Sequence, residues 1–518
     1  MPRGVIFDSF VGGRGFKRKR LRLLFLSASG WDRILRFIGM LRQRWLKFAL
    51  LAAAAHAAVS FAARADTLEG SLADAYRTNP TLNAQRASVR ATDENVPQAL
   101  AGYRPRVAVT ASGGQQSLST TSKLTASELN IPGIGGVGGG TTYPSLSGYN
   151  SPFSTGLTIT QTLFNGFQTA NRTRQAEAQV LAARAGLAVS EQNVLLNAVI
   201  AYMNLLRDAA IVELQKSNVE VLQEQLRQTR DRFNVGEVTR TDVAQAESSL
   251  AGGRSQLLTA QANYTASVAT YRQVIGHSPG HLAPASPVDR FSPNTLEKAI
   301  ALGIQSNPAV ATGEFNVDAA QLNVKIQEGA LLPNVAVQGN VQKNYLAVGT
   351  LQTMESFSAS VLGTLTIPIY QGGSEYSLIR QAKETLGQRR LDLATARDQV
   401  RQAVVQAWGQ LDAAKANIEA TQAQVQAAEI ALNGIREEAR VGQRTTFDVL
   451  TAQQTLVNAR VAVVTAQHDR IVASYTLLAN VGRLDPAVLG LPVQVYEPQV
   501  HYMQVRDAWA GTRNPDGR

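Results

Sequence analysis

Apolar side chains recur every seven positions within residues 375–440, a stretch of 66 residues that contains no proline. This spacing keeps one apolar seam against neighbouring helices, so it predicts a coiled-coil helix. At ~1.5 Å per residue the helix would be roughly 100 Å long, which exceeds the diameter of a compact domain. It therefore has to pack sideways against other long helices. The seam consists of Leu411, Ile418, Val425, Leu432 and Ala439.

A tight turn and a return helix are predicted to follow the long helix. Gly442 can adopt the left-handed conformation that ends a helix. Thr445 and Asp448 have the spacing of a capping box, whose side chains satisfy free backbone amides at the start of a helix. The return helix then occupies residues 445–480, about half the length of the long helix. Together these elements predict a helical hairpin.

The chain contains two copies of one unit. Paired motifs lie 228 positions apart in the first part of each copy and 206 positions apart in the later part. Each copy predicts a leading helix, two short strands, a long helix, a turn and a return helix. The leading helices are expected at 68–101 and 296–331, and the two copies at 66–290 and 291–484. The pairs include Pro105 with Pro333, Gly236 with Gly442, Asp242 with Asp448, and Gly276 with Gly482.

The first copy has 22 additional residues between about positions 114 and 157. They include a glycine-rich run at 133–140, flanked by serine and threonine, which predicts one long exposed loop. Both predicted strand pairs begin and end in helices. If these strands form a transmembrane barrel, their connecting loops face outward, so residues 117–149 are expected to be accessible from outside the cell.

The predicted strands alternate between apolar and polar side chains. In 157–163, Leu157, Ile159 and Leu163 share one face, whereas threonines take the other. Residues 335–342 and 361–369 alternate in the same way. Strands of about nine residues with this pattern suit a transmembrane barrel, although a half-buried soluble sheet has the same alternation.

The number of strands constrains the assembly. Four strands per chain cannot close a barrel. Two chains would provide eight strands and a lumen filled with side chains, and three would provide twelve strands and an open pore. Inner faces made of threonine, glutamine and asparagine favour the open pore.

The positive charge of the chain is confined to its leader. The formal net charge is +11, and residues 1–65 alone hold 13 basic and two acidic side chains. Residues 66–518 hold 37 of each, so nothing indicates a nucleic-acid partner. An apolar run ends at Ala63-Arg64-Ala65, which is the pattern of a cleavable signal peptide. Translation that starts at Met40 would leave this signal peptide at the N-terminus. The alternative interpretation is that the apolar run is retained as a membrane anchor. The chain has no cysteine, and therefore no disulfide and no thiol for a lipid anchor.

Four motifs in the chain resemble signatures of the TolC family of outer-membrane channel-tunnels. The resemblance covers about residues 67–482. It implies a membrane α+β fold: a trimeric twelve-stranded transmembrane β-barrel, with four strands per chain, continued into the periplasm of a Gram-negative cell by a long α-helical barrel of coiled-coil hairpins. The matching motifs are Leu163-Phe164-Asn165-Gly166, Val235-Gly236-Glu237-Val238-Thr239-Arg240-Thr241-Asp242, Ile367-Pro368-Ile369-Tyr370-Gln371-Gly372-Gly373 and Val441-Gly442-Gln443-Arg444-Thr445-Thr446-Phe447-Asp448.

The resemblance also implies a function and partners. The chain would be the exit duct of a tripartite system for drug efflux or type I protein secretion. Its partners would be two further copies of itself, a periplasmic adaptor protein, an inner-membrane transporter and outer-membrane lipid.

Particular residues carry roles by the same resemblance. Asp242, Arg444 and Asp448 would form the periplasmic gate. The turns at Val235, Gly236, Val441 and Gly442 would contact the adaptor. Two positions depart from the family, because Ala439 stands where an aromatic gate partner is expected and Thr451 where a second acidic ring is expected. The simpler interpretation of Asp242 and Asp448 is the capping box alone.

No pattern indicates catalysis, a cofactor or a metal. The glycines at 133, 135 and 138 match a dinucleotide fingerprint in spacing but open no helix. His277 and His281 are separated by Pro279 and Gly280, which exclude the helical face that a metal pair needs.

The residue patterns alone are also compatible with two classes of protein other than a channel. One is a periplasmic adaptor and the other is a structural coiled-coil protein of the cell envelope. The prolines of residues 485–518 indicate a loosely ordered tail.

Overall fold

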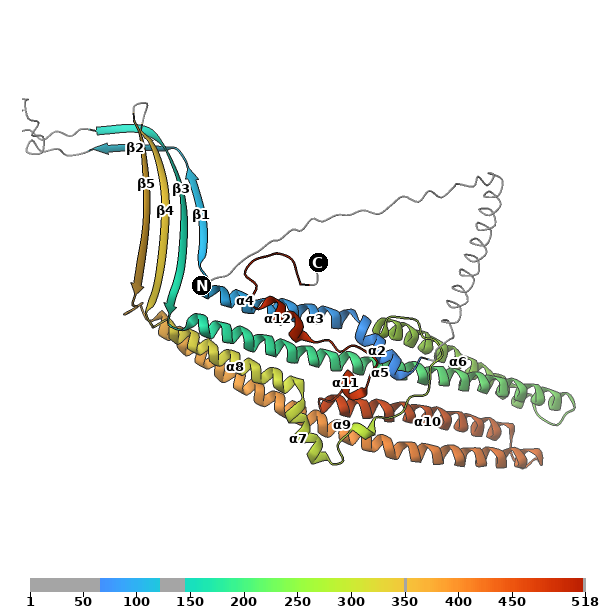
Figure 1. The fold of residues 1–518 in the computed structure, drawn as a ribbon. Coiled ribbons are helices and arrows are strands. Elements are labelled where there is room, and N and C mark those ends of the chain that lie inside the picture. The colour runs from blue at the N-terminus through green and yellow to red at the C-terminus, as the bar shows by residue number, and fades with distance from the viewer. Residues whose placement is uncertain (1–65, 122–144, 349–351, 516–518) are drawn as a thin grey trace, which may run out of the picture. The chain divides into compact units, whose positions relative to one another are not determined.

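The computed structural model describes residues 66–121, 145–348 and 352–515. Two long helices dominate this part of the chain, and each has 67 residues: α5 (Gln168–Asn234) and α9 (Ser374–Arg440). A return helix packs beside each of them, α6 (Arg240–Ile275) beside α5 and α10 (Thr446–Asn480) beside α9 (Figure 1). The hairpin predicted from the heptad seam is confirmed. Leu411 and Leu432 of that seam are buried in α9.

The two leading helices are broken, so the prediction of one continuous helix in each copy was wrong. The first break of each copy falls at an asparagine followed by proline, Asn79 and Asn307, and a further break at Glu94 separates α3 from α4. Proline disfavours the helical conformation of the residue before it, and each asparagine side chain caps the helix that follows. The segments are α2 (Leu68–Thr78), α3 (Pro80–Asp93) and α4 (Asn95–Leu100), then α7 (Leu296–Ser306) and α8 (Pro308–Gly329).

The described strands form one antiparallel sheet in the order β1-β3-β4-β5, with β2 paired to β3 beyond the end of β1. β3, β4 and β5 are longer than the nine residues expected, with 21, 15 and 15 residues. The expected loop at 114–157 is therefore strand at both of its ends, and its centre, 122–144, lies outside the described residues. The strands are β1 (Arg106–Gly113), β2 (Gln116–Thr121), β3 (Ser145–Asn165), β4 (Asn334–Val348) and β5 (Gln352–Thr366).

The register of the sheet produces one continuous apolar face. Leu157 of β3 lies opposite both Val109 of β1 and Val341 of β4. The threonine face is continuous too, and Thr158 donates a hydrogen bond to Asn340 across it. A bulge after Thr162 shifts the register. As a result Phe164, and not Leu163 as expected, stands opposite Val335 on the apolar face.

The helices form a layer in which some have neighbours on both sides and others on one. α5 packs against α6, α8 and α10, and α9 packs against α8 and α10. The largest core lies where α2, α3, α5, α6 and α10 meet, and includes the fully buried Tyr202 and Tyr271. Among the described helices, α5 alone is long and apolar enough to cross a membrane by length and composition, and half of its most apolar window is buried inside the structure.

The tail is more ordered than its prolines suggested. Residues 486–505 contain two short helices, α11 (Pro486–Leu489) and α12 (Pro498–Val505). In each, proline occupies the first helical position, where its missing N–H costs nothing. Leu491 and Val505 are buried, and α12 lies against α3 (Figure 1). The expectation of a loose tail is therefore wrong over these residues.

Candidate functional site

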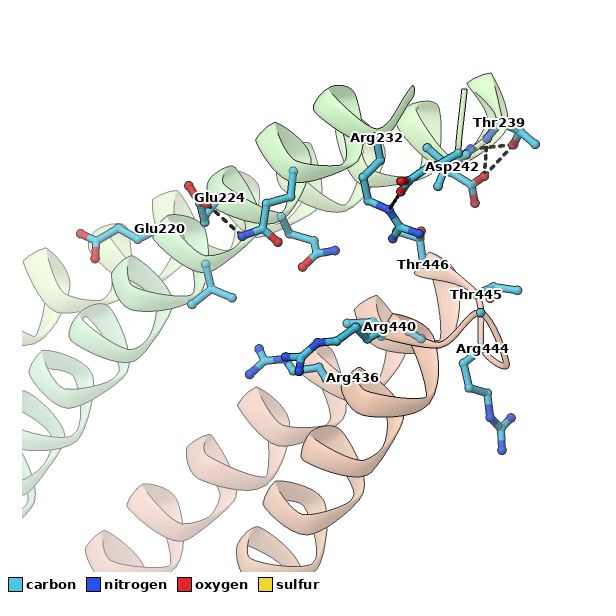
Figure 2. Close-up of a pocket in the computed structure, with 18 of the residues that line it drawn as sticks. Glu220, Glu224, Arg232, Thr239, Asp242, Arg436, Arg440, Arg444, Thr445 and Thr446 are labelled. Carbon is cyan, nitrogen blue, oxygen red and sulfur yellow. Dashed lines mark hydrogen bonds and ion pairs between the residues drawn. The ribbon is translucent and has the colours of Figure 1, made fainter. Parts of the chain in front are cut away.

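A cavity of about 930 Å³ lies between the tips of the two hairpins. Its walls come from the end of α5, the start of α6, the end of α9 and the start of α10. Charged side chains of both signs line it, among them Glu220, Glu224, Arg232, Asp242, Arg436 and Arg440. Figure 2 shows Arg436 and Arg440 extending from α9 into the space between the hairpins.

The two turns at the tips have the same backbone. Gly236 has φ of 82° and Gly442 has φ of 79°, both in the left-handed region. A Cβ atom at either position would meet nothing within 4 Å, so the backbone conformation alone selects glycine. The valines before them are 73% and 70% exposed, although valine usually lies in a core. Each tip thus presents an apolar side chain to its surroundings.

A capping box begins each return helix, as the sequence predicted. Asp242 Oδ2 accepts hydrogen bonds from Thr239 N at 2.9 Å and from Thr239 Oγ1 at 2.7 Å. Asp448 Oδ2 accepts the same two bonds from Thr445, at 3.0 and 2.9 Å. These hydrogen bonds stabilise the ionised carboxylates and hold the pKa of both Asp242 and Asp448 below the ordinary value.

Arg444 lies beside its own turn. Its Nε donates to Glu438 Oε2 at 2.9 Å, and in Figure 2 its guanidinium points away from the first hairpin. The hydrogen bond with Glu438 raises the pKa of Arg444, and Asp448 adds a smaller attraction. Among the described residues of one chain, no ion pair joins Arg444 to Asp242. The structure therefore brings Arg444 near Asp448, and it places Arg444 and Asp242 on the same cavity without an ion pair between them.

The first turn has a matching ion pair that the sequence analysis missed. Arg232 Nε lies 2.9 Å from Glu237 Oε2, so an arginine and a glutamate close both turns. Their order along the chain is reversed, since Arg232 precedes its turn and Arg444 follows its own. The sequence signal for these pairs is an arginine and a glutamate five or six positions apart on opposite sides of a glycine turn.

The two positions that depart from the family have local partners. Thr451 donates through Oγ1 to the carbonyl oxygen of Phe447 in its own helix, at 2.9 Å. Ala439 packs in a small cluster with Val449 between α9 and α10. Neither side chain provides a charge or an aromatic ring at the tip.

The histidine pair lies far from the tips, after α6. His277 Nε2 lies 3.5 Å from Asp74 Oδ2, and the ring packs edge-on against Tyr271. Within the part of the chain that the structure describes, no group of three His, Cys, Asp or Glu side chains could hold a metal ion.

Comparisons with known proteins agree on one family. The model of a family described as outer membrane efflux protein matches residues 72–277 and 299–483. The chain is 41% identical to outer membrane efflux protein BepC of Brucella suis, over 88% of this chain and 94% of the relative. It is 26% identical to outer membrane protein TolC of Escherichia coli, over 66% and 72% of the two chains. It is also 26% identical to the alkaline protease secretion protein AprF of Pseudomonas aeruginosa, over 66% and 72%.

Solved structures share the fold. The Campylobacter jejuni CmeC outer membrane channel superposes with a TM-score of 0.67 at 16% identity, over 85% of this chain and 89% of that one. The outer membrane protein VceC of Vibrio cholerae superposes with a TM-score of 0.64 at 19% identity, over 80% and 96%.

Proposed function

Because the chain belongs to the outer membrane efflux protein family, we propose that it forms the outer-membrane exit duct of a tripartite export system. The observation that carries this proposal is the 41% identity to an efflux protein across 94% of that relative. The chain is an outer-membrane protein. Its partners in export are an inner-membrane transporter, which selects the cargo, and a periplasmic adaptor. The chain works as a duct and not as an enzyme.

The duct closes as a trimer with a twelve-stranded barrel. β1 and β5 are the edges of the sheet in one chain, and their free backbone groups need partners inside a membrane. Three copies joined edge to edge provide twelve strands and an open lumen. The apolar face with Val109, Leu157 and Val341 then meets lipid, and the threonine face lines the pore.

The helical layer closes at matching edges. Helix α6 packs against α5, and helix α9 packs against α8 and α10. One side of α6 and one side of α9 therefore remain for contact with a neighbouring copy. Large apolar side chains are exposed on both, Leu258 on α6 and Leu391 and Ile430 on α9. Contacts between α6 of one copy and α9 of the next would cover them. The two repeats of the sequence, 66–290 and 291–484, each contribute one hairpin to this tunnel.

The hairpin tips form the periplasmic gate. Asp242, Arg444 and Asp448 provide its charged links between hairpins of neighbouring copies, in addition to their roles inside each turn. The exposed turns at Val235, Gly236, Val441 and Gly442 are the contacts for the adaptor, whose apolar groups would cover the two valines.

The mature chain begins at Asp66. This residue follows the cleavage pattern, and it is held in place: its N–H donates to His281 O at 2.7 Å and its own carbonyl accepts from Tyr202 Oη at 2.7 Å. An α-amino group at this position can still donate to His281. N-terminal sequencing of the membrane form should begin at Asp66, and a start before Ala63 would contradict cleavage here.

Two experiments test the function. Deletion of the gene should raise sensitivity to toxic small molecules, and a plasmid copy should restore resistance. A second candidate, protein secretion, is favoured by the likeness to AprF, so the secreted proteins of the same strains should be compared. If neither sensitivity nor secretion changes, the export proposal fails.

Release from membranes by an alkaline wash without detergent would favour an adaptor or a structural coiled-coil protein instead.

A further inference from the structure

The tail lies along the first leading helices and is held there by three arginines of the body. Each arginine stacks on one aromatic ring of the tail. The distances from guanidinium carbon to ring centroid are 5.2 Å for Arg86 on Tyr496, 5.0 Å for Arg184 on Tyr502 and 4.5 Å for Arg104 on Trp509. Such stacks are stabilising because the ring face is negative.

Polar contacts fix the same path. Arg77 donates to Pro492 O at 2.5 Å near the start of the tail. In its middle, the fully buried Asp93 lies 3.0 Å from His501 Nδ1. Near the end, Arg104 Nη1 donates to Ala508 O at 2.6 Å. The tail therefore runs from α2 along α3 to the end of α4.

The last of these contacts lies at the base of the sheet. Arg104 stands two residues before β1, and the adjacent Tyr103 accepts a hydrogen bond from Gln161 of β3 through its carbonyl oxygen. The apolar face of the sheet begins just beyond, at Val107. Trp509 is 73% exposed at this level, and Tyr103 and Phe167 are exposed at the same end of the sheet.

We propose that the tail places Trp509 in the headgroup region of the periplasmic leaflet, where its ring contacts phospholipid. This inference rests on the proposed function, in which the sheet spans the outer membrane. Tryptophan favours the membrane interface because its ring is apolar and its indole N–H is polar. Arg104, stacked beneath the ring, provides the positive charge that a lipid phosphate attracts.

The side of the tunnel follows from its use as a duct. Three tails on the inner surface would obstruct the bore, so the tail lies on the outer surface. The apolar face of the sheet meets lipid on that same side. The exposed ring of Trp509 thus continues the lipid-facing surface toward the periplasm by means of a segment about 400 positions away in the chain.

Tryptophan fluorescence in lipid tests the proposal directly. The chain has four tryptophans, and Trp31 and Trp45 lie in the leader that the proposed cleavage before Asp66 removes. Replacement of Trp408 by phenylalanine therefore leaves Trp509 as the only tryptophan of the mature chain. This variant of the mature chain is reconstituted in phosphatidylcholine vesicles with acyl chains brominated either near the headgroup or near the chain ends. Headgroup-proximal bromine should quench Trp509 about twofold, and bromine near the chain ends should quench it clearly less.

Two matched reporters separate the outcomes. In a background without the other tryptophans, Phe357→Trp reports on the exposed sheet, and native Trp408 reports on helix α9 away from it. Quenching of Trp509 and of Phe357→Trp, with Trp408 unaffected, supports the proposal. If Phe357→Trp is quenched and Trp509 is not, the tail is away from lipid, for example against a neighbouring copy, and the inference is overturned while the barrel stands. If neither is quenched, the membrane-spanning sheet itself is refuted.

Discussion

At the scale of single residues, the hairpin tips combine structural and proposed gating roles in the same side chains. Asp242 and Asp448 have almost identical capping geometry, since each accepts from the N–H and the hydroxyl of a threonine three positions earlier. Arg232 and Arg444 have equivalent ion pairs within their own turns. The two hairpins thus provide matched controls for one another. Any difference between equivalent substitutions measures what the assembly adds to the local structure.

Asp448→Ala should weaken block of the channel by a trivalent cation at least about tenfold, because a ring of three carboxylates near the axis would lose its charge. Asp242→Ala removes an equivalent capping box and should change block much less. The measurement is single-channel conductance in planar bilayers at several salt concentrations. The pKa of Asp448 is lowered, so its charge and the block should persist until the pH falls below the ordinary aspartate range. Equal block in both variants would leave only the capping roles.

Arg444→Ser should raise conductance roughly twofold or more, because it removes the charged link proposed between neighbouring hairpins. The control is Arg232→Ser, which breaks the equivalent pair with Glu237 inside the first turn. If only local turn stability matters, both variants will behave alike, and the gate assignment of Arg444 fails. With alanine at 439 and threonine at 451, the proposed gate would have few other links to compensate.

At the scale of elements, the joint between helix segments depends on close backbone contacts. Gly482 follows α10 with φ of 84°, and a Cβ atom there would lie 2.6 Å from Ser306 O. Asn307 Nδ2 donates to Asn480 O at 2.9 Å, which joins the break between α7 and α8 to the end of the return helix. In the first copy, a Cβ atom at Gly276 would lie 2.8 Å from the side-chain oxygen Oγ1 of Thr78. The Asn-Pro breaks therefore bend each leading helix where it meets the end of a return helix.

Gly482→Ala should destabilise the chain more than Gly442→Ala. Both positions have positive φ, so each alanine costs about 1–2 kcal/mol of backbone strain. Only Gly482 has a backbone oxygen in the way, and moving α7 to admit a methyl group should add about 1–3 kcal/mol. Thermal unfolding followed by circular dichroism in detergent measures the difference. Equal losses would show that the contact with Ser306 can relax freely.

At the scale of the whole molecule, one chain is incomplete as a membrane structure. Within the described residues, β1 and β5 leave two sheet edges unpaired, and α6 and α9 leave apolar side chains exposed. One rotation that relates each copy to the next would cover both kinds of edge. It would place β1 of one copy beside β5 of the next, and α6 beside α9.

The purified protein should therefore migrate in SDS without heating at about three times the mass of the mature chain. The proposed trimer would resist the detergent because every strand would be paired around a closed barrel. Native mass spectrometry in detergent provides the independent measurement. A monomer or dimer there would refute the twelve-stranded barrel while leaving the fold of one chain unchanged.

The sequence by itself determined those features whose causes are local. The heptad seam, the two capping boxes and the glycine turns depend on residues within a few positions of one another, and the structure has them where they were predicted. Strand alternation also predicted a sheet with one apolar face. The Asn-Pro breaks at Asn79 and Asn307 were equally local, and their signal was present but not used.

Only the tertiary structure decided the features that join distant segments. The bulge that brings Phe164 opposite Val335 arises from pairing between β3 and β4, which no single strand records. The order of the tail depends on Arg86, Arg104 and Arg184, which lie more than 300 positions before the rings they stack on. Prolines restrict the local conformation of the tail, but its buried contacts with α3 determine its path, because packing energy comes from surfaces that meet only after the chain has folded.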